Sequence, residues 1–185
     1  MEKLNNEATL LKRDGVEASL NFEVWRVIRD PDTLKFHSET LNQHSAYFQV
    51  AVNAHFVAMI LPLYRIFERR ENSINLPQLI KKLRSNSTLE EDALTYLEQK
   101  LDELKPTWVK IAVLRNEVFG HRSSKYDVSE SFARAKISSD DLEIFVGDTL
   151  GLLNEVDRLL NEKYFLCKTG AGEDLLSILR VLSIK

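Results

Sequence analysis

The sequence predicts an all-α fold in which several helices pack side by side as a bundle. Three observations support this prediction. Apolar residues recur three and four positions apart over long segments, which is the spacing of one face of an α-helix. The 185 residues include six glycines and four prolines, few enough to suit long helices. They contain no internal repeat or low-complexity tract, so we expect a single domain over residues 1–185.

A proline separates the first two predicted helices. Apolar residues predict a first helix that ends near Arg29; they are Leu10, Leu11, Val16, Leu20, Val24 and Val27. The Asp-Pro-Asp segment at 30–32 is a helix stop and restart signal. A second, long helix carries Leu41, Phe48, Val52, Met59, Leu63 and Phe67 and ends at residues 71–73. Pro62 should kink it, because proline removes a backbone donor and crowds the preceding turn.

The middle of the chain predicts a short helix followed by a long one. Residues 76–83 carry Pro77 in their first turn, where proline is tolerated. The next helix spans 88–119 and begins with a threonine and a glutamate at capping-box spacing. Pro106 should interrupt or bend this helix, and Gly120 should end it.

The last third of the chain predicts a polar loop and two more helices. The loop covers 121–138, with a helical turn near Phe132, and Ser138 caps the helix that follows. The apolar residues of that helix are Leu142, Phe145, Val146, Leu152, Leu153, Val156 and Leu160. Residues 169–172, Thr-Gly-Ala-Gly, should break it before a short, apolar C-terminal helix.

The composition is that of an ordinary soluble protein, with 44% hydrophobic and 29% charged residues. The net charge of −3 excludes a generic polyanion binder, so any nucleic-acid site must be local. Cys167 is the single cysteine, which excludes an intramolecular disulfide. The N-terminus lacks the pattern of a secretion signal, and the longest apolar stretch, 56–63, is too short to span a bilayer. We therefore expect a cytoplasmic protein without a membrane partner.

The histidines do not predict a metal site. His37, His44 and His55 share one face of the expected second helix. At a rise of about 1.5 Å per residue, however, they lie roughly 10 and 16 Å apart along it. No known metal, phosphate-loop or cofactor motif occurs elsewhere, so we expect neither a metal nor a cofactor.

Residues 115–121, Arg-Asn-Glu-Val-Phe-Gly-His, carry the candidate functional site. In a regular helix Arg115 shares a stripe with apolar residues, which are Leu104, Trp108, Ile111, Val118 and Phe119. Burying an unpaired cation is costly, so an anionic or carbonyl-bearing group must meet the guanidinium. Two interpretations stay open. A structural arginine would pair with a carboxylate of its own chain or with the carbonyl end of its helix, whereas a functional one would bind a ligand phosphate.

The same residues resemble the HEPN superfamily. Its signature is an Arg, a following polar residue and a His four to six positions after the Arg, at a helix end. Here these residues are Arg115, Asn116 and His121. Residues 114–122, Leu-Arg-Asn-Glu-Val-Phe-Gly-His-Arg, are similar to the AbiU-type branch, named for phage abortive infection. The similarity extends back to residues 63–69, Leu-Tyr-Arg-Ile-Phe-Glu-Arg.

The resemblance implies a HEPN-like up-and-down helical bundle with a kinked long helix and a short C-terminal helix. It also implies a homodimeric, metal-independent endoribonuclease of phage defence or of a toxin–antitoxin system, with an antitoxin protein as a further partner. Two residues depart from the family pattern. Some HEPN toxins carry, two residues beyond the motif His, a Tyr that an antitoxin modifies, and Ser123 stands there. Gly120 stands where the branch often has alanine, which we expect to loosen the turn rather than abolish it.

The residue types suit RNA cleavage. His121 would act as general base or acid, because the unperturbed pKa of histidine lies nearest to neutral pH. Arg115 would stabilise the pentavalent phosphate, and Asn116 would orient the imidazole or the phosphate. The products would be a 2′,3′-cyclic phosphate and a free 5′-hydroxyl, and DNA should resist cleavage.

The spacing of the motif raises a geometric problem. Six positions separate Arg115 from His121, so on one straight helix their side chains would point about 120° apart. Either Gly120 ends the helix and lets His121 fold back, or a second subunit completes the cleft. Both solutions stay open at this point.

The loop after the motif is a candidate RNA-binding segment. Arg122, Ser123, Lys125 and Tyr126 place cations, a hydroxyl and an aromatic ring there, which suits a phosphate backbone and a stacked base. A second basic segment, 62–86, offers a local positive face. The alternative function is a HEPN-fold module that binds RNA, nucleotide or a partner protein without catalysis.

Overall fold

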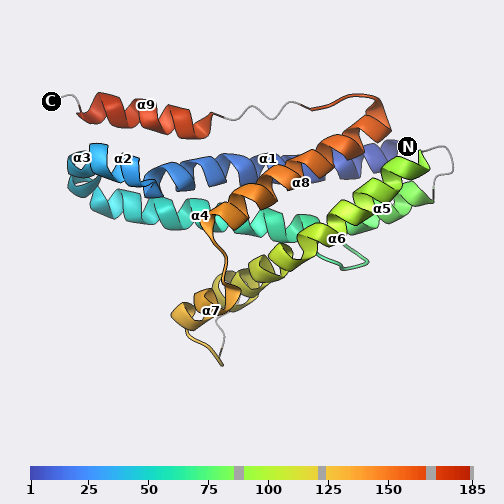
Figure 1. Ribbon diagram of the computed structural model, residues 1–185, viewed down its shortest axis with the longest axis horizontal. Helices are drawn as coiled ribbons and strands as arrows, with labels where there is room; N and C mark the ends of the chain where they lie inside the picture. The colour runs from blue at the N-terminus through green and yellow to red at the C-terminus, as the bar shows by residue number, and fades with distance from the viewer. Residues whose placement is uncertain (86–89, 121–123, 166–169, 184–185) are drawn as a thin grey trace.

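The computed structural model describes residues 1–85, 90–120, 124–165 and 170–183. The regular elements in these residues are all helical (Figure 1), which confirms the predicted all-α class. They are α1 (Glu2–Arg29), α2 (Pro31–Phe36), α3 (Ser38–Gln43), α4 (Ser45–Phe67), α5 (Leu76–Arg84), α6 (Glu91–Leu114), the π-helix η1 (Arg115–Gly120), α7 (Val128–Ala135), α8 (Ser139–Asn161) and α9 (Ala171–Ser183).

Two long helices, α1 and α4, form the axis of the bundle and lie side by side (Figure 1). Helix α8 crosses α1, and α9 lies along α1 on the side away from α4. Helices α5 and α6 pack together near the N-terminus of the chain. From there α6 runs obliquely across the bundle and delivers η1 to α7, which projects at one corner.

The hydrophobic core lies among α1, α4, α5, α6 and α8. Met59, Leu63 and Ile66 of α4 have no exposed surface. In α6, Ile111 and Leu114 are also completely buried, which fixes the end of that helix in the core. The removal of such side chains from water is the main stabilising contribution to a fold of this kind.

The predicted second helix is wrong in one respect, because three helices replace it. The backbone leaves the helical conformation at His37 and His44, with φ of −116° and −114°. A contact distant in sequence lies at the first break. The hydroxyl of Ser183 in α9 lies 2.9 Å from Nδ1 of His37 and 3.0 Å from Oγ1 of Thr40, so α9 holds the short helix α3 against itself.

Neither internal proline ends its helix. Pro62 is buried inside α4, which continues to Phe67 and ends there rather than at residues 71–73. Pro106 lies on the exposed side of α6, where solvent can bind the carbonyl that proline leaves without a donor. The expected interruption at Pro106 is therefore wrong.

The capping predictions have different outcomes. The hydroxyl of Ser138 accepts the backbone N–H of Asp141, whose carboxylate accepts the N–H of Ser138, so the cap of α8 is confirmed. Thr88, proposed to cap α6, lies outside the described residues. The helical turn expected near Phe132 is a complete helix, α7, and α9 already begins at Ala171.

Helix α4 has the length and composition of a membrane span. Its most apolar window has a mean hydropathy of 1.6, and it is the one such helix in the part of the chain that the structure describes. The apolar stretch at 56–63 is too short to span a bilayer, but α4 as a whole, Ser45–Phe67, is long enough. Helix α4 packs along α1 and buries Met59 and Ile60 completely, so part of its apolar surface belongs to the core of the bundle.

Candidate functional site

The Arg-Asn-Glu-Val-Phe-Gly segment adopts a π-helix directly after α6. A π-helix bonds each carbonyl to the N–H five residues on, and short π segments are frequent at functional sites. Here the wider turn lets both Leu114 and Phe119 face the protein. Leu114 is completely buried, and the ring of Phe119 packs edge-on against Phe56 of α4 and Phe132 of α7, with centroids 5.8 and 6.3 Å apart.

Arg115 is half-buried without a carboxylate partner among the described residues. Its guanidinium lies over the ring of Tyr64 in α4, with Cζ 4.7 Å from the ring centroid. Its Nη1 donates a hydrogen bond to Oδ1 of the exposed Asn116 at 2.9 Å. The carboxylate lock that one structural interpretation predicts is therefore absent from the described residues.

The ring that carries Arg115 is itself stacked. Tyr64 lies against Trp108 of α6 with ring centroids 6.1 Å apart and an interplanar angle of 23°. The indole Nε1 of Trp108 is buried without a hydrogen-bond acceptor in the described residues, so the ring is held by stacking and by apolar packing against the core. A ladder of Trp108, Tyr64 and Arg115 thus connects α6, α4 and η1.

Gly120 closes the π-turn against Arg115. A Cβ atom built on Gly120 would lie 2.8 Å from the backbone oxygen of Arg115 and 3.4 Å from its guanidinium carbon. Contacts as short as 2.8 Å do not occur for real Cβ atoms, and the carbonyl is part of the backbone and cannot rotate away. The turn is present with glycine at position 120, and the close approach to Arg115 disfavours a larger residue there.

A carboxylate in the motif anchors η1 to α7. Both oxygens of Glu117 lie 2.7 Å from Nη1 of Arg134, and the buried hydroxyl of Ser131 donates to Glu117 at 3.0 Å. Glu117 therefore binds Arg134 and Ser131 and does not pair with Arg115. These roles of Tyr64, Glu117 and Arg134 are absent from the sequence prediction, because no local pattern reports which side chains meet across helices.

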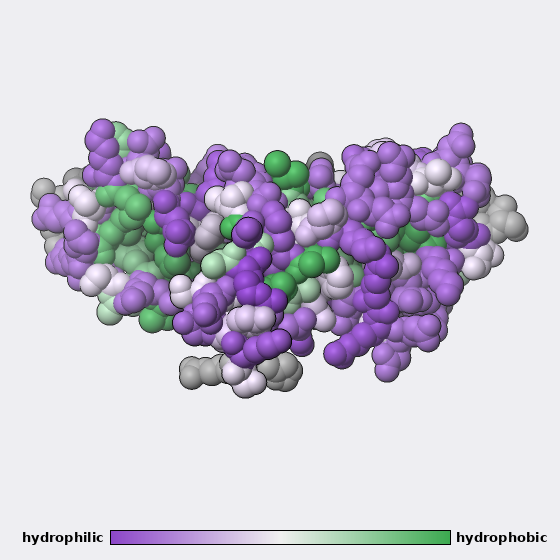
Figure 2. Space-filling view, turned by 60° about the horizontal axis from the view of Figure 1, so that its bottom comes forward, coloured by the Kyte–Doolittle hydropathy of each residue, from purple (hydrophilic) through white to green (hydrophobic). Residues whose placement is uncertain are grey.

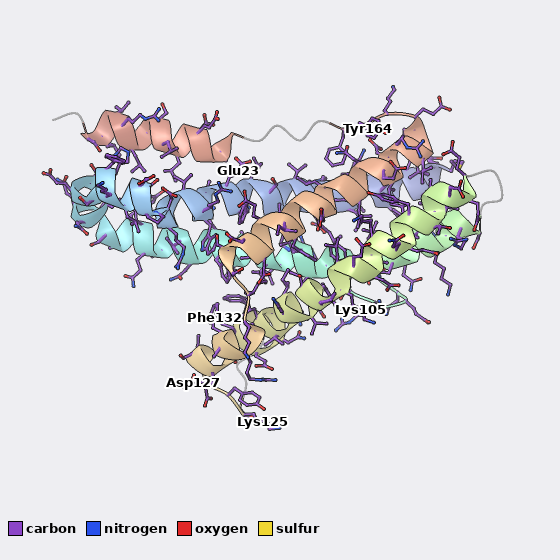
Figure 3. All side chains as sticks on the ribbon, viewed as in Figure 1. Glu23, Lys105, Lys125, Asp127, Phe132 and Tyr164 are labelled. Carbon is purple, nitrogen blue, oxygen red and sulfur yellow. The ribbon has the colours of Figure 1, made fainter. Side chains whose placement is uncertain are left out.

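The other residues of the predicted site are described in part. His121, Arg122 and Ser123 lie outside the described residues. Lys125 lies at the outer tip of the segment before α7 in Figure 3, and its Nζ is 5.8 Å from the ring centroid of Tyr126.

The ring of Tyr126 also packs against a second cation. The guanidinium carbon of Arg134 lies 3.9 Å from its centroid. Arg134 is bound to Glu117 at the same time, so this ring contributes to the packing of α7. A role of Tyr126 in stacking a base stays a prediction.

The expected basic face of residues 62–86 is largely neutralised. Four cations are paired with carboxylates: Arg65 with Asp14, Arg70 with Glu68, Lys82 with Glu7, and Arg84 with Glu91 and Glu98. Within the described part of this segment, Arg69 and Lys81 are the cations without such a pair. The unneutralised positive charge of the described segment is therefore confined to Arg69 and Lys81.

The described residues also contain no group of three His, Cys, Asp or Glu side chains that could hold a metal ion. The chemistry available in this part of the molecule is that of a fixed guanidinium, an exposed amide and two stacked rings. Such groups bind anions and aromatic rings.

Comparison with protein families identifies the chain. The AbiU2 family model of the HEPN superfamily matches residues 1–173, a range that contains α1 to α8 and the motif. The chain therefore belongs to this abortive-infection family, which confirms the resemblance seen in the sequence. We found no match among the curated proteins or the solved structures.

Proposed function

We propose that this member of the AbiU2 family is a metal-independent endoribonuclease whose site contains Arg115. The observation that carries the proposal is the state of this arginine. Tyr64 and Asn116 hold the guanidinium in place, and no described carboxylate neutralises it. A fixed guanidinium of this kind suits two phosphate oxygens and the negative charge that develops on phosphate during cleavage.

The proposed reaction uses the RNA's own nucleophile. The imidazole of His121 takes the proton of a ribose 2′-hydroxyl, the 2′-oxygen attacks the adjacent phosphorus, and the bond from phosphorus to the 5′-oxygen breaks. The departing 5′-oxygen takes a proton from an imidazolium or from water. We assign Arg115 and His121 to one phosphate because both belong to the motif, and in the homodimer proposed below they come from different chains.

The test is cleavage of RNA in the presence of EDTA. Purified protein should yield 2′,3′-cyclic phosphate and 5′-hydroxyl ends, and His121→Ala should stop cleavage while retaining helicity. A substrate with a single 2′-deoxy sugar should not be cut at that sugar. Cleavage by His121→Ala at the wild-type rate, or cleavage of the deoxy position, would contradict the mechanism.

We propose further that two copies form a homodimer with a composite cleft. Mixing the two inactive variants Arg115→Ala and His121→Ala tests this arrangement, because a mixed dimer then holds one complete site. We expect activity to return in the mixture and to be absent in each variant alone. Mixed dimers without activity would instead place Arg115 and His121 of one site in the same chain.

The proposed biological role is the arrest of infected cells by cutting cytoplasmic RNA, with an antitoxin protein as the expected restraint. Induced expression should then stop growth, and His121→Ala should relieve the arrest. Lys125, together with Arg122 and Ser123, remains a proposed contact to RNA. Growth arrest that persists with the His121 variant would contradict a role for cleavage.

A further inference from the structure

Three cations on one side of the molecule have no acidic partner in the described residues. They are Arg115, Lys105 of α6 and Arg69, which follows the end of α4. The neighbouring cations Arg65 and Arg70 are paired, and Glu103, two residues before Lys105, binds Lys100 at 2.6 Å. Unpaired cations in a region where others are neutralised are available for an external anion.

The three cations are connected by aromatic rings. Arg69, Lys105 and Trp108 line one small hollow between α6 and the segment that follows α4. Figure 3 shows Lys105 on α6 beside this segment. Trp108 then stacks on Tyr64, which carries Arg115. Lys105 and Arg115 are ten residues apart, which corresponds to about 15 Å along a helix axis.

We propose that these residues form a track for single-stranded RNA that leads along α6 to the phosphate at Arg115. The inference rests on the proposed function of the Arg115 site and names the path by which its substrate reaches it. Cations that follow a backbone, interleaved with rings that contact bases, are the common chemistry of single-strand binding. Trp108 and Tyr64 are half-buried, so each ring keeps an exposed part that a base can contact. An acidic peptide would use the cations but would have no need of the rings.

The track differs from the loop that the sequence first suggested. Lys125 lies at the tip beside α7, whereas Lys105 lies on α6, well away from that tip (Figure 3). The surface over α5 and α6, in the right half of Figure 2, is predominantly hydrophilic, as a nucleic-acid contact requires. RNA would therefore extend from Arg115 toward α5 in addition to any contact near α7.

Charge reversal tests the track. Lys105→Glu and Arg69→Glu are made in the His121→Ala protein. The matched control is Lys163→Glu, the residue before Tyr164, which Figure 3 shows near the C-terminal end of α8. Binding of a labelled single-stranded RNA of about twelve nucleotides is measured over a salt series. We expect each track variant to weaken binding about tenfold and to reduce the slope of log K against log salt by about 0.7. The control should retain both values.

A second measurement reports on the rings. The chain has two tryptophans, so in Trp25→Phe the indole emission comes from Trp108. RNA should quench this emission, because bases contact the ring. Two results together would overturn the proposal in favour of an acidic protein partner. Polyglutamate would compete with RNA for binding at equal charge, and RNA would leave the Trp108 emission unchanged.

The outcomes separate this inference from the proposed function. Suppose that the wild-type protein cuts RNA, while Lys105→Glu and Arg69→Glu bind RNA with unaltered affinity and salt slope. This result would overturn the track but not the ribonuclease. Weakened binding in both variants, with no cleavage by the wild-type protein, would support the track and contradict the ribonuclease.

Discussion

The guanidinium of Arg115 lies 4.7 Å from the ring centroid of Tyr64, a residue fifty-one positions earlier in the chain. This contact holds a cation at the protein surface without neutralising it. A carboxylate in place of the ring would have fixed the arginine equally well but would have cancelled its charge. The aromatic partner therefore leaves the charge available for a phosphate.

Replacing Tyr64 should reduce activity more than stability. Tyr64→Leu removes the ring under Arg115, a contact worth about 0.5–1 kcal/mol when exposed. We expect kcat/KM for RNA to fall because the guanidinium is no longer held in one place. Tyr64→Phe keeps the ring and should lose less. Equal losses in the two variants would point to the hydroxyl and not to the ring.

Alanine at position 120 should damage the π-helix. The new Cβ would lie 2.8 Å from the carbonyl oxygen of Arg115, and relieving that contact should cost about 1–3 kcal/mol in the free energy of unfolding. Gly147→Ala is the matched control, because nothing lies within 4 Å of its Cβ position on α8. That change should stabilise the protein by up to about 1 kcal/mol. Urea unfolding measures both, and a Gly120→Ala protein as stable as wild type would contradict the close packing.

Glu117 should act through the position of η1. Glu117→Ala removes its hydrogen bonds to Arg134 and Ser131, and the loss should be modest because Arg134 is largely exposed. A double-mutant cycle with Arg134→Ala, measured by urea unfolding, should give a coupling of about 0.2–1 kcal/mol. Additive effects of the two changes would show that the ion pair does not contribute.

The cap of α8 should make stability depend on pH. The backbone N–H of Ser138, followed by the ammonium of Lys110, lowers the pKa of Asp141. A lowered pKa in the folded state gives stability that is fully present above about pH 3.9 and is lost as the pH falls through the folded value. Asp141→Asn should therefore destabilise the protein at neutral pH, with a penalty that shrinks in acid. Urea midpoints across this range test the effect, and a penalty independent of pH would contradict it.

Local signals in the sequence predicted the fold well where local contacts decide it. The cap at Ser138 and the restart at Pro31 depend on neighbouring residues and were predicted correctly. The break at His37 involves a contact with Ser183 of α9, which no local pattern reveals.

The site shows the same division between local and distant contacts. Arg115 was found because a cation interrupts an apolar stripe. The π-turn was not predicted, since it depends on Phe119 packing against Phe56 and Phe132, two residues from other helices. The ring of Tyr64 under the guanidinium was missed for the same reason.

The cleavage rate of Arg115→Ala tests the central claim most directly, with Arg65→Ala as its control. Arg65 donates two hydrogen bonds to Asp14, at 3.3 and 2.6 Å, and is thus a structural arginine. In EDTA, we predict that Arg115→Ala lowers kcat/KM for RNA at least about 100-fold. Its free energy of unfolding should fall only by the lost contact with Tyr64, about 0.5–1 kcal/mol. Arg65→Ala should lower the urea midpoint and retain cleavage. An Arg115→Ala protein that cuts RNA as fast as wild type would contradict the account.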